Sequence, residues 1–142
     1  MARRRRGSSA AGLRGRVERR ARWRCEYCHA PQRVSGYRFH VEHIIPRAQG
    51  GSHAPRNRAL ACASCNLAKS DKTVGIDPRT GVEVALFNPR AQSWEEHFRW
   101  APDRQTLRGR TPTGRATVAT LNMNSDLHLE ARRLWFATGW LP

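Results

Sequence analysis

The chain has 142 residues and carries 26 Lys and Arg residues against 11 Asp and Glu residues, a formal net charge of +15 at pH 7. No apolar run approaches the ~18 residues of a membrane span, and no apolar stretch of a secretory signal follows the basic start. We therefore expect a cytoplasmic protein with no membrane partner. The charge excess favours a polyanionic partner, most commonly nucleic acid. An anionic membrane surface is the rival, but the sequence offers only a weak candidate for the amphipathic helix it requires.

The first half of the chain predicts short elements around a long loop. Residues 1–12 lack periodicity and are rich in Arg, Gly, Ser and Ala, which predicts a disordered basic arm. Leu13, Val17 and Ala21 recur four residues apart, which predicts a short helix over 13–22. The next elements are a strand over 37–45, a loop over 46–57, a second strand over 58–65 and a helix that begins at 66.

The second half predicts an extension of the same domain. Its elements are a strand over 82–89, a helix or turn over 93–100 and helices over 112–123 and 126–139. The aromatic residues Trp94, Phe98 and Trp100 are expected to form a satellite core rather than a base-stacking surface. The overall expectation is an α+β fold, with a core over 13–75 and a mainly helical extension over 76–142 packed on it.

All four cysteines fall into two Cys-x-x-Cys pairs, "CEYC" and "CASC", so Cys25, Cys28, Cys62 and Cys65 leave none unpaired. Each such turn presents two thiolates on one side of an ion, and two turns complete the tetrahedron that Zn²⁺ prefers. In a reducing compartment this spacing predicts a structural zinc site. Two disulfides are the main alternative. A redox-active pair is a weaker one, because no thioredoxin-type βα unit surrounds either turn.

The residues between the two pairs carry a recognisable pattern: "HVEHIIPRAQGG", then Asn57, then "CASCNLAK". An acid-His-Ile-x-Pro run, a Gly-Gly loop, an Asn and Cys-x-x-Cys-Asn-x-x-Lys in this order resemble the HNH endonucleases. The C-terminal stretches "LFNPR", "WEEHFRW" and "TPTGRATVATLNMN" also look like the tail of one bacterial branch of stand-alone HNH proteins. The resemblance therefore extends from residue 13 into the C-terminal extension.

This resemblance implies a ββα-metal core, treble-clef-like, in which a hairpin and a helix surround one divalent ion beside a structural zinc. By position, His43 matches the general base and Asn57 the residue whose side-chain oxygen orients the imidazole. Glu42 and Asn66 match the two metal ligands, so the chain is a His-Asn-Asn variant. Two oxygen ligands favour Mg²⁺ or Mn²⁺ over softer metals.

The resemblance also implies metal-dependent hydrolysis of DNA phosphodiester bonds, with double-stranded DNA as the expected substrate, by a monomer or a transient dimer. Lys69, Arg47 and Arg58 are the residues expected to contact nucleic acid. His40 is expected to have a structural or surface role rather than to assist the metal or the DNA, and His53 is expected to fill the loop rather than to contact phosphates. The alternative function is a non-catalytic zinc-containing module that binds nucleic acid. Restriction, phage defence, mobile elements and repair are all compatible with the pattern.

Overall fold

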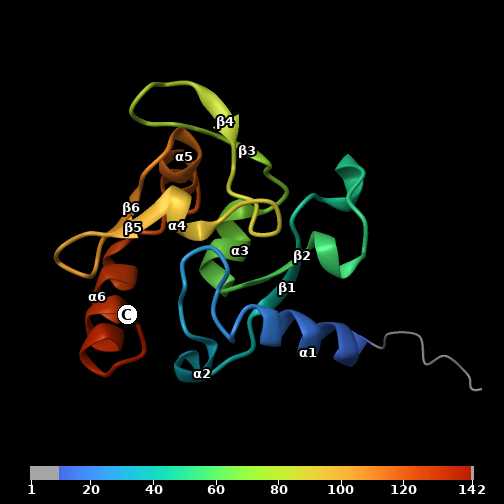
Figure 1. The fold of residues 1–142 in the computed structure, drawn as a ribbon, viewed down its shortest axis with the longest axis horizontal. Helices are drawn as coiled ribbons and strands as arrows, with labels where there is room; N and C mark the ends of the chain where they lie inside the picture. Colours follow the sequence, from blue (N-terminus) through green and yellow to red (C-terminus); the bar gives the residue numbers. More distant parts are fainter. Residues whose placement is uncertain (1–9, 142) are drawn as a thin grey trace, which may run out of the picture.

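The computed structural model describes residues 10–141 as short helices and three two-stranded antiparallel sheets (Figure 1). The predicted basic arm lies outside the described residues, except that its last three residues already belong to the first helix. None of the described helices combines the length and apolar content that crossing a bilayer requires. With η for 3-10 helices, the elements are α1 Ala10–Arg20, α2 Gln32–Ser35, β1 His40–His43, η1 Arg47–Gln49, η2 Pro55–Asn57, β2 Arg58–Ala61, α3 Ala63–Lys69, β3 Val74–Ile76, β4 Glu83–Ala85, α4 Trp94–His97, β5 Phe98–Trp100, β6 Leu107–Gly109, α5 Pro112–Thr120 and α6 Asp126–Ala137.

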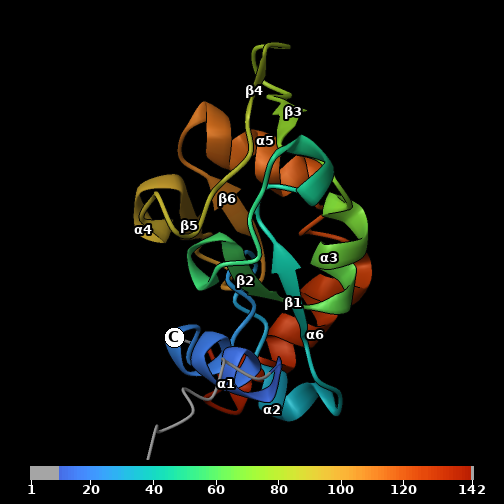
Figure 2. The same ribbon diagram turned by 90° about the vertical axis from the view of Figure 1, so that its right-hand side faces the viewer.

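The first sheet is the hairpin formed by β1 and β2, whose register pairs His40 with Ala61 and His43 with Arg58. Most of β2 is fully buried, because α1 packs against it while α3 contacts both strands (Figure 2). Only one residue, Cys62, separates β2 from α3, and its side chain caps the helix. This segment therefore has the order strand, strand, helix around the long connecting loop.

The C-terminal extension contains two further hairpins, β3 with β4 and β5 with β6, beside α5 and α6. Helix still exceeds strand in this extension, as expected, but the two hairpins were not predicted as pairs. The predicted boundary after residue 75 falls inside β3. Helix α5 contacts β6, β3 and β4. It also contacts α4, and this approach depends on Gly114, where an added Cβ would lie 2.0 Å from the carbonyl oxygen of His97.

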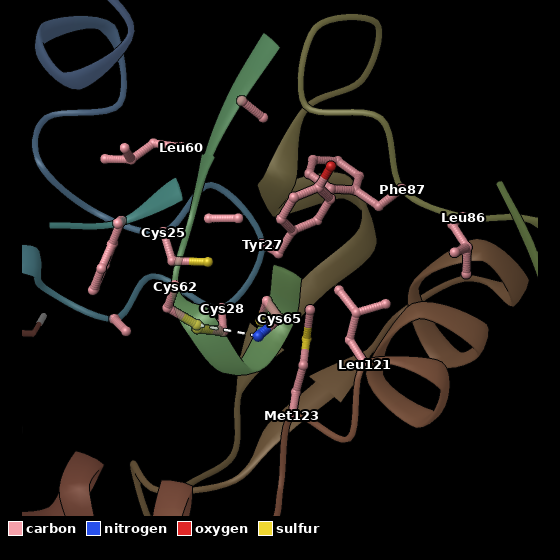
Figure 3. Close-up of a cluster of buried hydrophobic side chains, with 14 of the residues drawn as sticks. Cys25, Tyr27, Cys28, Leu60, Cys62, Cys65, Leu86, Phe87, Leu121 and Met123 are labelled. Atoms are coloured by element: carbon pink, nitrogen blue, oxygen red, sulfur yellow. Dashed lines mark hydrogen bonds between the residues drawn. The ribbon is translucent and has the colours of Figure 1, made fainter. Parts of the chain in front are cut away.

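One buried cluster joins the two halves of the chain. It contains the four cysteines and apolar residues of both halves, among them Tyr27, Leu60, Phe87, Leu121 and Met123 (Figure 3). The tail aromatics pack against this cluster: the Trp94 ring stacks on His29 with centroids 3.9 Å apart and also contacts Phe98. These rings therefore contribute to packing, as expected.

Candidate functional site

The four cysteines meet at one buried point. Cys25 and Cys28 lie in the turn after α1, whereas Cys62 and Cys65 begin α3 (Figure 3). All four sulfur atoms lie within 4.8 Å of one another, and the Sγ atoms of Cys28 and Cys62 are 3.7 Å apart. A tetrahedral zinc with Zn–S bonds of about 2.3 Å places its sulfurs about 3.8 Å apart, whereas a disulfide needs about 2 Å. The four thiols are all free, so the cluster fits a zinc ion and not two disulfides.

The electrostatics of the cluster also favour a cation. Hydrogen bonds from Cys25, Cys28 and Cys65 lower the pKa of the Cys62 thiol strongly. The pKa values of Cys28 and Cys65 are raised instead, because their thiols are hydrogen-bonded to neighbouring sulfurs and buried. A dication would allow all four thiols to ionise, which is the form that binds zinc.

Glu42, on β1, is buried and is bound by Tyr27 and Lys69. The Tyr27 hydroxyl donates a hydrogen bond to its Oε1, and the Lys69 ammonium lies 3.4 Å from its Oε2. Burial raises the pKa of Glu42, although Lys69 and Tyr27 oppose this effect by favouring the carboxylate. The carboxylate is therefore already paired with one cation inside the fold.

The expected contact of Lys69 with a phosphate is not what the structure shows. Lys69 is 2% exposed, because α3 directs it toward β1. Its ammonium donates to the carbonyl oxygen of Ile44 at 3.0 Å in addition to pairing with Glu42. Lys69 thus holds α3 to the strand that carries the site.

Asn57 was predicted to contact the imidazole of His43, but its side chain contacts backbone groups instead. The Oδ1 of Asn57 accepts from the backbone N–H of Ile45, and its Nδ2 donates to the carbonyl oxygens of Ile45 and Ser52. Gly51 is needed for this packing, since an added Cβ would lie 1.7 Å from the Ile45 carbonyl oxygen. Asn57 therefore fixes the backbone that follows His43 rather than the ring itself.

The ring of His43 points outward and contacts His53, a residue for which only a loop role was expected. His43 Nε2 lies 2.8 Å from His53 Nδ1, and the Arg47 guanidinium contacts His53 Nε2. Because arginine only donates, His53 Nε2 must accept, so its proton is on Nδ1 and points to the lone pair of His43 Nε2. The ten-residue separation across a loop gave no sequence signal for this pair.

The pKa of His43 is lowered by partial burial and by the neighbouring Arg58, His53 and Arg47. A lowered pKa keeps the ring neutral near pH 7, with a lone pair available on Nε2.

Two shallow hollows meet at Glu42 and Asn66. One, of about 350 Å³, is lined by Glu42, His43, Arg47 and Asn66 together with residues of the adjoining loops. The other, of about 400 Å³, is lined by Glu42 and Asn66 with His40, Arg58 and residues of α1. The structure thus brings together three of the four predicted site residues, and Asn57 supports them from behind.

The expected contact of Arg58 with nucleic acid finds little support, because its guanidinium turns back to donate to the Val41 carbonyl oxygen at 3.0 Å.

Comparison with known proteins gives one match. The sequence profile of the HNH endonuclease family matches residues 25–72, which include both cysteine pairs, β1, β2 and α3. No curated protein and no solved structure matches the chain. The matched segment contains the cysteine cluster and the two residues that line both hollows, Glu42 and Asn66. Its four cysteines fit the zinc-binding variant of the family. The match covers 48 of the 142 residues, and over this segment the chain is similar to an HNH endonuclease domain.

Proposed function

We propose that the protein is a metal-dependent endonuclease that hydrolyses phosphodiester bonds in double-stranded DNA. The observation that carries this proposal is the convergence of His43, Glu42 and Asn66 on one hollow within the matched HNH segment. The net charge of +15 supports a polyanionic substrate. Nucleic-acid binding and nuclease activity are what the HNH domain itself suggests.

His43 is the proposed general base. Its Nε2 lone pair now receives the N–H of His53, and an attacking water would take the place of that donor. The water's proton would move to Nε2, which leaves an imidazolium with its other proton on Nδ1. Arg47, which is exposed and borders the same hollow, is positioned to bind a phosphate oxygen.

Glu42 and Asn66 are the proposed ligands of a divalent cation. Their oxygen donors suit Mg²⁺ or Mn²⁺. Among residues 10–141 the Asn66 side chain has no hydrogen-bond partner, so its amide oxygen is available. A carboxylate offers about four lone-pair positions, so Glu42 retains acceptor capacity beside Tyr27 and Lys69. The ion, when bound, would neutralise charge on the phosphate and stabilise the leaving 3′ oxygen.

A supercoiled plasmid tests the proposed activity. Purified zinc-containing protein is incubated with Mg²⁺, with Mn²⁺ or without added divalent ion. We expect nicked or linear DNA only when the metal is added. Salt-sensitive binding without cleavage in any metal would instead favour the non-catalytic nucleic-acid-binding module, with Glu42 already neutralised by Lys69 as the physical reason.

A further inference from the structure

Most of the three basic residues that the sequence motif predicts to contact nucleic acid do not face the solvent. Lys69 is buried against Glu42, and Arg58 is turned toward the Val41 carbonyl oxygen. Of the three basic residues expected to contact nucleic acid, only Arg47 is exposed. A phosphate backbone that reached the hollows would therefore need other cations nearby.

Helix α1 and the turn after it supply them. Residues 10–24 contain six arginines and a single acidic residue, Glu18, whose carboxylate accepts a hydrogen bond from Gln32 at 2.7 Å. Arg16, Arg19 and Arg22 are exposed, and none of their guanidinium groups has an acceptor within residues 10–141. Arg16 and Arg19, three positions apart, share one side of the helix, and Arg22 continues past its end.

Two other arginines fix α1 to the hairpin that carries the site. Arg14 donates to the Phe39 carbonyl oxygen at 2.8 Å, immediately before β1. Arg20 donates to the carbonyl oxygens of Pro55 at 3.0 Å and Arg58 at 2.5 Å, at the start of η2 and of β2. These contacts, one from the middle of the helix and one from its C-terminal end, hold α1 beside β1 and β2 (Figure 2).

Helix α1 also borders the candidate metal ligands. Leu13 and Arg14 line the hollow of about 400 Å³ together with Glu42 and Asn66. From Arg16 to Arg22 the distance is on the order of 9 Å, a length over which each strand of duplex DNA carries about three phosphates. The row of arginines therefore matches a short stretch of one strand's backbone on the outer side of a helix that borders the hollow.

We propose that α1 is a guide for the backbone of duplex DNA, in which Arg16, Arg19 and Arg22 contact phosphates that flank the phosphate in the hollow. The inference rests on the proposed function for the identity of the polyanion. It assigns Arg14 and Arg20 to holding the helix in place and the three outer arginines to binding.

The salt dependence of binding tests this guide. The triple variant Arg16→Gln/Arg19→Gln/Arg22→Gln keeps residues of similar helix propensity. The control Arg99→Gln/Arg108→Gln/Arg133→Gln removes the same charge from exposed arginines of β5, β6 and α6, none of which lines either hollow. Affinity for a fluorescent duplex is measured across a salt series without added Mg²⁺ or Mn²⁺, after circular dichroism has shown that both variants are folded.

Loss of three phosphate contacts should make the slope of log K against log salt about 2.7 less steep in the α1 variant and nearly unchanged in the control. Equal slopes in the two variants, or an unchanged slope in the α1 variant, would overturn the guide. If the α1 variant is not folded, the three single variants replace it, each with an expected change of about 0.9. An unchanged slope in a protein that still cleaves plasmid refutes the guide alone, whereas the predicted slope in a protein that never cleaves refutes only the nuclease.

Discussion

Replacing Lys69 by Met should destabilise the protein strongly, because it leaves a buried carboxylate without its cation. The side chains of Lys69 and Glu42 are 2% and 5% exposed, and the ammonium lies 3.4 Å from the carboxylate. Removing one partner of such a pair typically costs about 3 to 5 kcal/mol. The hydrogen bond to Ile44 is lost as well, but Tyr27 still donates to Glu42. We therefore expect the free energy of unfolding to fall by about 3 kcal/mol, a large part of the ~5 to 15 kcal/mol of a typical domain.

Urea unfolding of the zinc-containing protein measures this change. The double variant Glu42→Gln/Lys69→Met removes both charges and should recover most of the loss. Together with the single variant Glu42→Gln, it gives the coupling energy between the two residues. Lys72→Met is the matched control, since Lys72 is exposed, and it should change stability by less than about 0.5 kcal/mol. The reasoning would be refuted if Lys69→Met resembled Lys72→Met, or if the double variant were no more stable than Lys69→Met.

Three further predictions concern the zinc site, the loop and one ion pair. Chelation should release one zinc per chain and abolish cooperative unfolding, since structural zinc contributes about 10 kcal/mol or more, and zinc quantification with calorimetry would show it. Gly51→Ala should lower the free energy of unfolding by about 3 kcal/mol, because the new Cβ would overlap the Ile45 carbonyl oxygen. The control Gly81→Ala has free space around the new Cβ but a φ of 72°, and it should lower the free energy of unfolding by about 1 kcal/mol. Equal losses in the two variants would argue against the overlap at Gly51. The Arg115 guanidinium donates two hydrogen bonds to the Asp77 carboxylate and lowers its pKa. The stabilisation by this pair is therefore fully present above the pKa of Asp77 in the unfolded chain, about 4, and is lost as the pH falls through the lower pKa of Asp77 in the folded protein. Stability measured from pH 5 downward should therefore decline less in Asp77→Asn than in the wild type, and parallel curves would contradict this.

The sequence predicted those parts of the fold that have strong local signals. The alternating residues before the Gly-Gly loop contain β1, the run after Asn57 contains β2, and the periodic segments near the C-terminus contain α5 and α6. The two cysteine turns predicted the cluster, because ligand spacing depends on local geometry alone. The hairpins β3–β4 and β5–β6 were missed as pairs, since strands of three residues are too short to show alternation.

The sequence predicted which residues form the candidate site better than it predicted the contacts that their side chains make. His43, Glu42 and Asn66 do line one hollow. The burial of Lys69 depends on how α3 packs on the hairpin, which no local pattern specifies. The partner of His43 likewise depends on the path of the loop, which brings His53 back across ten residues.

The measurement that tests the central claim most directly is the single-turnover cleavage rate of a DNA duplex by the wild type and by His43→Ala, with Mg²⁺ or Mn²⁺ present. His128→Ala is the control, because His128 lies on α6 and lines neither hollow. Loss of a general base should lower the rate by about 10² to 10⁴-fold with little change in duplex affinity, while the control cleaves as the wild type does. Cleavage by His43→Ala at the wild-type rate would contradict the assignment of His43 as the base and, with it, the proposed mechanism.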